Sequence, residues 1–524
     1  MLREAEAIAR EQGHRSISEL PELRGTAEGL LREFFDVASR SDPQWRYAFS
    51  SRVPLAIPDY PDIALIFLLR ALNAPHEPTD VHVLAADEWQ AQLALFVAHG
   101  GAQPVFAAGG VRGPARAARS LARRVCAPQR PRSCDVVLFT LGDNVAMGAP
   151  DAYFGDLAGA IGRSCSVITV FAASGKRLRF STLARALPLE AFLHFTDVLR
   201  AWTASKPREQ QDNDARATPV AALMAYLRAR EHVSGEVVMQ RVMAEAFERM
   251  FARLRPKAVV YPFENRSWEK NLLSAARRHG VARCVGYQHS SLTPRHLAFS
   301  AAAGLSGRDD LPDTILTCGE ITADRIRKEV PQARTLVTVG AALRARRLPV
   351  APAPKWAVLA PVSSSRAEAW EMLVALQQLA ARSDTPIRVR THPTIPIDDL
   401  YEQFRWPAHV QLSRGRSLAE DFEEAALVVY SSSTVALEGM LYGRLPIYLE
   451  IGDVPSGNPI DGEHEFAFRA ANVEELIELV AQIRGYSQER LEMLRGKARA
   501  YAERYLVEPT PANVERMAQL IARC

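Results

Sequence analysis

Polar side chains gather in two short segments of the C-terminal half, each directly after an apolar run that predicts a buried strand. The residues with groups suited to a nucleotide are Arg390, His392, Pro393, Ser431, Ser432, Ser433, Thr434 and Glu438. In an open parallel sheet, ligands bind outside the carboxyl ends of the strands, where both segments are expected to lie. Hydroxyl groups and free N–H groups at a helix start suit a phosphate, and His392 and Arg390 are expected to approach the same anion, whereas Glu438 suits a ribose diol. The alternative is that the serines only cap a helix and that His392 is an ordinary loop histidine.

A second group of polar side chains follows two apolar runs near the middle of the chain. Its members are Glu264, Asn265, Arg266, Gln288 and His289. Neighbouring parallel strands bring their carboxyl ends to one edge of a sheet, so these side chains are expected to lie together. A carboxylate beside a histidine suits general acid–base chemistry. Glu264 and His289 are therefore the predicted catalytic residues. The predicted substrate-binding residues are Asn265, Arg266 and Gln288.

Glu264 has competitors for the role of reacting carboxylate. The rival acidic residues are Asp87, Glu88 and Glu269. The alternative to a catalytic role is that Glu264 forms a surface salt bridge with Arg266 or Lys270. Such a pair contributes little stability. His289 has a similar alternative, as an ordinary residue at the end of a strand.

A weaker signal is the run of serines at 363–365, which follows the first strand of the C-terminal half. Small residues in such a loop allow a phosphate to approach the backbone closely. We predict that Ser364 and Arg366 take part in substrate binding, although polar loops at strand ends are common.

Arginines accumulate between residues 112 and 132, a stretch without acidic side chains. Four of them are spaced at three and four residues, so a helix would place them on one face. These four are Arg112, Arg116, Arg119 and Arg123. One interpretation is docking on the anionic inner face of the cytoplasmic membrane. The alternative is a solvated helix face.

Apolar runs that alternate with helical patterns predict the elements that position these residues. The predicted strands lie at 81–84, 104–107, 135–139, 167–171, 258–261, 283–287, 314–317, 356–359, 387–389, 427–430 and 445–449. Strands that are apolar throughout are typical of a parallel sheet covered by helices on both faces. Three prolines within 348–355 predict an extended linker. The predicted fold class is therefore α/β, with two doubly wound, Rossmann-like domains.

The predicted segments follow from this pattern. They are extra N-terminal helices (1–50), a first Rossmann-like domain (51–347), the linker (348–355), a second Rossmann-like domain (356–506) and a terminal helix that crosses back to the first domain (507–524). A threonine and a proline at 510–511 suit the start of that last helix.

Composition excludes several classes of protein. The chain has 524 residues, of which 48% are hydrophobic and 24% charged, as in ordinary globular proteins. A net charge of +4 does not favour nucleic-acid binding. The six cysteines include no C-x-x-C pair, which fits a reducing compartment. The N-terminus lacks the apolar core of a signal peptide, and its longest apolar run, at 63–69, is far shorter than the ~20 residues of a transmembrane helix. We expect a cytoplasmic protein, peripheral to the membrane if the arginine segment binds lipid.

The R-x-H-P segment at 390–393 and the S-S-S-T-x-x-x-E-G segment at 431–439 resemble motifs of bacterial GT-B glycosyltransferases of surface polysaccharide synthesis. The chain looks most like the branch that uses CMP-activated sugars, which includes capsule and O-antigen Kdo transferases and sialyltransferases. The resemblance implies that the His-Pro dipeptide and the hydroxyl cluster bind a CMP-linked donor in the second domain, across a cleft from an acceptor-binding first domain. Related folds that use UDP-, GDP- or CDP-linked donors are the alternative.

The implied substrates are a nucleotide sugar and a glycan or lipid-linked glycan, such as an O-antigen or lipopolysaccharide chain, with no further cofactor. The lack of an acidic cluster at a predicted strand end predicts a reaction without an obligatory metal. Two other functions fit the same architecture. One is isomerisation, as in UDP-N-acetylhexosamine 2-epimerases, and the other is a non-catalytic subunit that binds nucleotide sugars.

Overall fold

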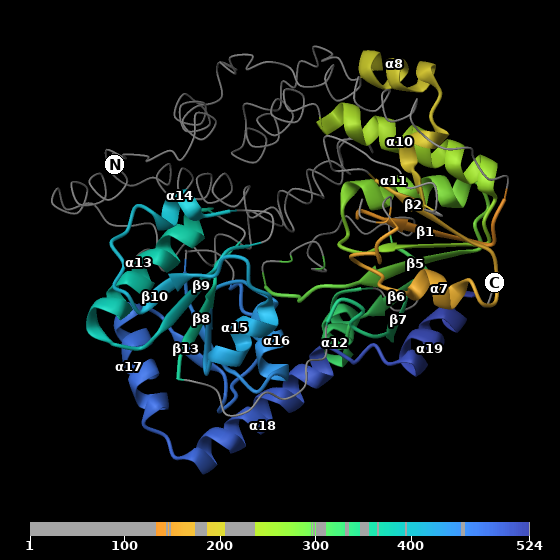
Figure 1. Ribbon diagram of the computed structural model, residues 1–524. Helices are drawn as coiled ribbons and strands as arrows, with labels where there is room; N and C mark the ends of the chain where they lie inside the picture. Colours follow the sequence, from red (N-terminus) through yellow and green to blue (C-terminus); the bar gives the residue numbers. More distant parts are fainter. Residues whose placement is uncertain are drawn as a thin grey trace, which may run out of the picture.

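The computed structural model consists of two α/β domains, each built on a sheet in which all strands are parallel (Figure 1). The residues described by the structure are 133–142, 145, 148–172, 186–204, 236–294, 296, 299, 311–330, 335–345, 356–363, 366–392, 396–451 and 456–522. The α/β prediction with two doubly wound domains is therefore confirmed. The predicted N-terminal helices, the arginine-rich segment and the proline linker lie outside the described residues.

The first sheet has seven strands in the order β3-β2-β1-β4-β5-β6-β7. Its strands are β1 (Val136–Thr140), β2 (Val167–Phe171), β3 (Ala186–Pro188), β4 (Ala258–Pro262), β5 (Arg283–Gln288), β6 (Thr314–Thr317) and β7 (Leu336–Val339). The central strands β1 and β4 are buried along their whole length, because helices cover both faces of the sheet.

The second sheet has six strands in the order β10-β9-β8-β11-β12-β13. Its strands are β8 (Val358–Pro361), β9 (Ile387–Arg390), β10 (Val410–Leu412), β11 (Leu427–Tyr430), β12 (Leu445–Leu449) and β13 (Phe468–Ala470). One continuous apolar core surrounds this sheet and extends to the helices at Val473–Arg484 and Gln488–Tyr505.

Helices cover the two faces of the first sheet in separate layers. Those of the first domain are α7 (Leu157–Ile161), α8 (Phe195–Ala204), α10 (Glu236–Leu254), α11 (Ser267–Arg278) and α12 (Glu320–Glu329), with a 3-10 turn η4 (Leu189–Phe192). Figure 1 shows α10 and α11 on one side of the sheet and α7 on the other. Each side has its own apolar core.

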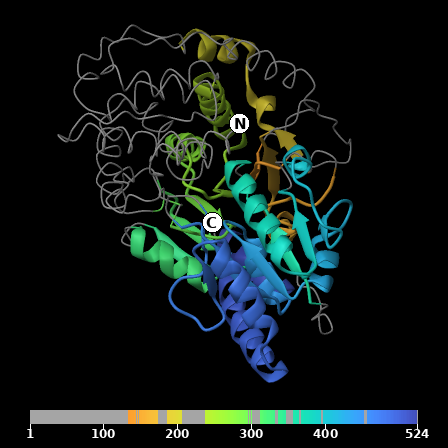
Figure 2. The same ribbon diagram turned by 90° about the vertical axis from the view of Figure 1, so that its left-hand side faces the viewer.

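The remaining helices follow in the second half of the chain. They are α13 (Arg366–Arg382), α14 (Asp398–Tyr401), α15 (Leu418–Glu424), α16 (Val435–Leu441), α17 (Val473–Arg484), α18 (Gln488–Tyr505) and α19 (Pro511–Ala522). Figure 2, which views the molecule from the side of the second domain, shows α18 along its lower edge.

The last helix packs against the first domain rather than the second. Met517, Ala518 and Ile521 of α19 lie in the apolar core formed with α7 and the first sheet. Helix α19 begins at Pro511, and the hydroxyl of Thr510 accepts a hydrogen bond from the N–H of Asn513 at 3.2 Å. This capping contact starts a new helix after α18, so the chain turns back across the boundary between the domains.

Candidate functional site

Each sheet contains a point at which the order of its strands reverses. In the first sheet this point lies between β1 and β4, and in the second it lies between β8 and β11. On both sides of such a point the connections leave toward opposite faces, which opens a crevice at the carboxyl ends of the two strands. The loops after these four strands are therefore the first place to look for a ligand site.

In the second sheet, serines from the loops after β8 and β11 meet at this position. The hydroxyl oxygens of Ser363 and Ser432 lie 3.1 Å apart, and Ser432 also donates to the carboxylate of Glu368 at 3.4 Å. Ser433 accepts a hydrogen bond from the N–H of Val435 at 3.2 Å. The predicted hydroxyl cluster thus lies at the reversal point of the second sheet, together with Ser363, which was not among the predicted binding residues.

The other predicted nucleotide-binding residues differ in how they are held. Arg390 forms a 2.5 Å ion pair with the buried Asp421 and also donates to the carbonyl of Arg416 at 3.2 Å, so its guanidinium is used within the domain. His392 is half-buried just beyond β9, and this burial lowers the pKa of its imidazole. Glu438 is half-buried in α16.

Three predicted residues have no described side chain. Pro393 and Ser364 lie outside the described residues, and Arg366 is described only as the first residue of α13.

At the reversal point of the first sheet, the loop after β4 has a fixed and unusual shape. Asn265 adopts a left-handed conformation with φ of 58°, which a non-glycine residue rarely does. The buried carboxylate of Glu269 accepts hydrogen bonds from the N–H groups of residues 264, 265 and 266, at 2.9, 2.9 and 3.0 Å. The side chain of Asn265 accepts from the buried Lys270. Glu269 and Asn265 therefore shape the loop that presents Glu264.

The carboxylate of Glu264 lies within a group of positively charged and ionisable side chains. Its oxygens are 2.6 Å from Nε of Arg266 and 3.4 Å from Nε2 of His289, and the side chain is only 17% exposed. Burial raises the pKa of Glu264, but Arg266, His289 and His296 outweigh burial and hold that pKa below its ordinary value. Glu264 is therefore an anion at neutral pH. The pairing with Arg266 expected in the alternative interpretation is present, but in a partly buried setting beside a histidine.

His289 is held against aromatic rings and is neutral at physiological pH. Its ring meets that of Tyr153 edge-on, with centroids 4.7 Å apart. Burial lowers the pKa of His289 to about 4, against the opposing effect of Glu264. The structure thus places an ionised carboxylate beside a neutral imidazole, and a neutral imidazole is able to take up a proton.

Three further residues near Glu264 or His289 were missed by the sequence analysis. They are His296, Tyr153 and Arg344. The N–H of Thr293 donates to Nδ1 of His296 at 2.9 Å, and burial lowers the pKa of His296 to about 4. The guanidinium of Arg344 lies 5.3 Å above the ring of Tyr153 and forms no ion pair within the described parts of the chain. None of the three directly follows a predicted strand, and the sequence analysis took its candidates from the ends of predicted strands.

Gln288, by contrast, is turned into the interior of the first domain. It is 1% exposed, its amide nitrogen donates to the carbonyl of Ser290, and its oxygen accepts from the thiol of Cys318 at 3.5 Å. Both ends of this amide are therefore used inside the domain, and the structure does not bring it to Glu264.

The carboxyl edges of the two sheets are joined by direct contacts. The hydroxyls of Ser291, after β5, and Thr434, after β11, lie 3.1 Å apart. The hydroxyl of Tyr505 in α18 accepts from the N–H of Leu292 at 2.8 Å and donates to its carbonyl at 2.9 Å. These contacts set the loop that follows β5 against the serine cluster of the second domain.

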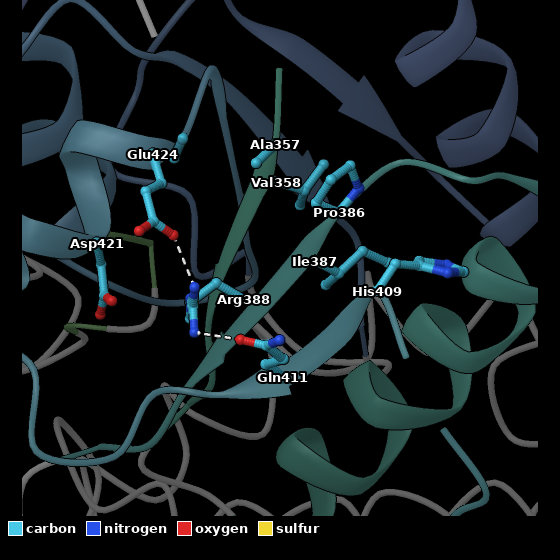
Figure 3. Close-up of a pocket in the computed structure, with 10 residues that line it drawn as sticks. Ala357, Val358, Pro386, Ile387, Arg388, His409, Gln411, Asp421 and Glu424 are labelled. Atoms are coloured by element: carbon cyan, nitrogen blue, oxygen red, sulfur yellow. Dashed lines mark hydrogen bonds and ion pairs between the residues drawn. The ribbon is translucent and has the colours of Figure 1, made fainter. Parts of the chain in front are cut away.

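A separate pocket of about 140 Å³ lies in the second domain (Figure 3). It opens at the amino ends of β8, β9 and β10, beside α15. Figure 3 shows Arg388 bonded to Glu424 and to Gln411, at 2.6 and 2.9 Å, so its charge is already neutralised. The pocket is at the edge opposite to the serine cluster and is not part of the candidate site.

Within the described residues, no group of histidine, cysteine and acidic side chains is arranged to hold a metal ion. Across the same part of the chain, no helix combines the length and apolar character needed to cross a bilayer.

These two sheets, with a terminal helix that returns to the first, have the architecture of GT-B proteins. No protein-family model matches the chain, and no curated protein matches its sequence. Solved structures to which it is similar include UDP-GlcNAc 2-epimerase from Neisseria meningitidis bound to UDP-GlcNAc (10% identity, 74% of this chain and 98% of that chain, TM-score 0.39). Others are Acinetobacter baumannii MurG (12%, 75% and 100%, 0.41) and Anabaena HepE in complex with UDP and glucose (12%, 75% and 100%, 0.42). Similarity at this level assigns no activity, which must be argued from the residues of this chain.

Proposed function

We propose that the chain is a glycosyltransferase that moves a sugar from a nucleotide donor to a glycan acceptor. The observation that carries the proposal is that the loop after β5, the strand next to the reversal point of the first sheet, meets the hydroxyl cluster at the reversal point of the second sheet. The 3.1 Å contact between Ser291 and Thr434 brings the hydroxyl cluster of the second sheet to the edge of the first sheet that carries Glu264 and His289. A nucleotide on one side and an ionised carboxylate on the other are the two parts that glycosyl transfer needs.

The nucleotide is assigned to the second domain. Ser363 and Ser432, with Ser433 and Thr434, offer hydroxyl groups to a phosphate at the crevice where ligands bind in open α/β sheets. His392 and Glu438 are the remaining proposed contacts. Arg390 contributes indirectly, because it is held by Asp421.

The chemistry is assigned to Glu264 and His289. Glycosyl transfer passes through a sugar with oxocarbenium-like positive charge, and a low-pKa carboxylate stays ionised to stabilise that charge. The acceptor hydroxyl must lose a proton, which the carboxylate or the neutral imidazole beside it accepts. Both groups are in the required protonation state at neutral pH.

The proposed donor is a CMP-linked ulosonic acid such as Kdo, and the proposed acceptor is a surface glycan such as capsule or O-antigen. Arg344 supports an acidic sugar, because its guanidinium lies over the Tyr153 ring that contacts His289 and has no ion-pair partner within the described residues. The His-Pro and serine motifs support a CMP donor through their resemblance to transferases of that branch. A cytoplasmic location, peripheral to the membrane, and a metal-independent reaction are further parts of this proposal.

The first experiment is a thermal-shift panel with CMP, CDP, UMP, UDP and GDP. A nucleotide at 100 times its dissociation constant adds about 2.7 kcal/mol to the free energy of unfolding. We expect CMP to give the largest shift, and a larger shift with UDP would assign the chain a UDP-linked donor instead.

The second experiment compares Glu264→Gln with Glu248→Gln, a matched change at a half-buried residue of α10 that pairs with Arg278 and His279. Glu264→Gln should lower transfer to a glycan acceptor by about a hundredfold or more and leave nucleotide affinity within a few-fold. Glu248→Gln should change neither. Near-normal transfer in Glu264→Gln would move the catalytic role to Asp87 or Glu88. Release of free nucleotide with a rearranged sugar, in the absence of acceptor, would indicate an epimerase.

A further inference from the structure

Three arginines gather where the end of α16 meets α18, on the side of the second sheet away from the serine cluster. They are Arg444, Arg495 and Arg499. Helices α16 and α18 pack against each other, and Figure 1 shows them side by side. Arg444 directly precedes β12, so it lies at the amino end of that strand, whereas Ser431 follows the carboxyl end of β11. At about 3.3 Å per residue, the five residues of β12 separate the two positions by about 16 Å.

Arg444 is the buried centre of this arginine cluster. Only 2% of the residue is exposed. Its Nε donates to the carbonyl of Phe422 at 2.8 Å, and its guanidinium lies 5.3 Å from the centre of the Tyr442 ring. Its Nη2, in contrast, is buried and has no hydrogen-bond partner in the described chain. A buried guanidinium nitrogen without an acceptor is costly, and native proteins rarely leave one unsatisfied.

Arg495 and Arg499 add two more charges to Arg444. They are four residues apart on α18, so they lie on one face of the helix. Nε of each is buried without a hydrogen-bond partner, and neither forms an ion pair among the described residues. Burial, together with these two neighbours, lowers the pKa of Arg444 to about 10. Like charges at this spacing destabilise a helix.

The same domain pairs its other half-buried arginines with carboxylates. Arg388 binds Glu424, Arg390 binds Asp421, and Arg416 binds both acids at 3.0 Å. Two carboxylates, those of Glu423 and Glu492, act electrostatically on Arg444 and Arg495. Neither forms an ion pair with the arginine cluster among the described residues. The domain thus neutralises the charges of one set of arginines, whereas the other set has no ion-pair partner among the described residues.

Glycine occupies the position that an added side chain would close. Gly443 has φ of 77°, and a Cβ atom built on it would lie 3.0 Å from Nη2 of Arg499. The guanidinium therefore approaches the backbone at the end of α16, where the helix dipole is negative and favours cations. This dipole explains part of the attraction of the arginines to the site, but it supplies no acceptor for the unpartnered nitrogens.

We propose that Arg444, Arg495 and Arg499 form a binding site for a phosphate-bearing anion, distinct from the proposed nucleotide site. Planar guanidinium groups donate paired hydrogen bonds to phosphate oxygens, and a dianion offsets the charge that three arginines accumulate. The phosphate belongs either to a lipid headgroup or to a free phosphate compound. The proposal is independent of the transferase activity.

Inorganic phosphate is the first probe, with sodium chloride at equal ionic strength as the reference. Phosphate should raise the thermal midpoint of the wild type, and the apparent affinity should fall at least tenfold in Arg495→Gln/Arg499→Gln. The matched control, Arg490→Gln/Lys497→Gln, removes two charges from the same helix and should respond as the wild type does. Ser432→Ala/Ser433→Ala should also keep the phosphate response, which separates this site from the nucleotide site.

Two results would overturn the proposal. One is no phosphate effect beyond that of chloride in the wild type. The other is an equal effect in Arg495→Gln/Arg499→Gln, which would mean that the arginines only stabilise the end of α16. If that double variant does not fold, Arg499→Gln alone provides the same comparison.

Sedimentation with vesicles identifies the source of the phosphate. The probes are vesicles of phosphatidylcholine with phosphatidylglycerol, and vesicles of phosphatidylcholine alone. Binding to the anionic vesicles that Arg495→Gln/Arg499→Gln loses and Arg490→Gln/Lys497→Gln keeps would support a lipid headgroup. A phosphate response without vesicle binding would support a free phosphate compound.

Discussion

Replacing Tyr505 by phenylalanine removes one hydroxyl that joins α18 to the loop after β5. That hydroxyl accepts from the N–H of Leu292 at 2.8 Å and donates to the carbonyl of the same residue at 2.9 Å. Arg325 in α12 reinforces the contact, because it donates to the same carbonyl, to the Tyr505 hydroxyl at 3.2 Å and to the carbonyl of Pro459 at 2.7 Å. These hydrogen bonds, called here the Arg325–Tyr505 clasp, connect the first domain to the second beside the contact between Ser291 and Thr434.

The cost of the Tyr505→Phe change follows from the hydrogen bonds it removes. The N–H of Leu292 is buried, and leaving it without an acceptor costs about 1–3 kcal/mol. Because 1.4 kcal/mol corresponds to a factor of ten, local opening at this amide should become about 5 to 150 times more frequent. Arg325→Met removes donors to two carbonyls and should have an effect at the upper end of this range.

Hydrogen–deuterium exchange of the peptide that contains Leu292 measures this opening directly. Asp461→Asn is the control, because it removes only the ion pair of Arg325 with a side chain that is 58% exposed, and such pairs contribute less than about 1 kcal/mol. Exchange in that control should stay within a few-fold of the wild type. Unchanged exchange in both Tyr505→Phe and Arg325→Met would refute the reasoning that this clasp holds the domains together.

Two further predictions concern stability. Between pH 6.5 and about 4, His289 and His296 take up protons in the unfolded chain but not in the folded one, so the free energy of unfolding should fall as the pH falls, by about 3 kcal/mol for each histidine at 1.36 kcal/mol per pKa unit. A thermal midpoint that does not change across this range, or that changes equally in His289→Asn/His296→Asn, would contradict this. Gly319→Ala places a methyl group 2.0 Å from a carbonyl oxygen of α18 and should cost about 1–3 kcal/mol, whereas Gly496→Ala, which meets no atom within 4 Å, should not destabilise the chain. Equal thermal midpoints for the two variants would contradict this, because they would show that α12 and α18 can move apart at little cost in stability.

The sequence was sufficient to predict the central strands of both sheets but not their edges. The missed strands are β3, β7, β10 and β13, which are the outermost strands of their sheets. Strands β7, β10 and β13 each expose part of their length, and β3 has only three residues and includes a proline. An apolar run marks a strand that is buried on both faces, so edge strands of this kind lack the signal.

The site was predictable where it depends on strand ends and not where it depends on packing. Glu264 and His289 were expected to lie together, and the structure places them 3.4 Å apart. His296 and Arg344 reach the same place from loops whose path only the tertiary structure defines. Glu269 was considered a rival carboxylate, but it accepts three backbone N–H groups and shapes the loop, a role that depends on the left-handed turn at Asn265.

Titration of CMP by calorimetry tests the central claim most directly, namely that the serine loops bind the nucleotide and that the first domain supplies the chemistry. Charge-assisted hydrogen bonds contribute about 1.5–3 kcal/mol each, so Ser432→Ala/Ser433→Ala should weaken binding about tenfold or more, while Glu264→Gln should bind within a few-fold of the wild type. Equal affinity of the wild type and the double serine variant would contradict the account.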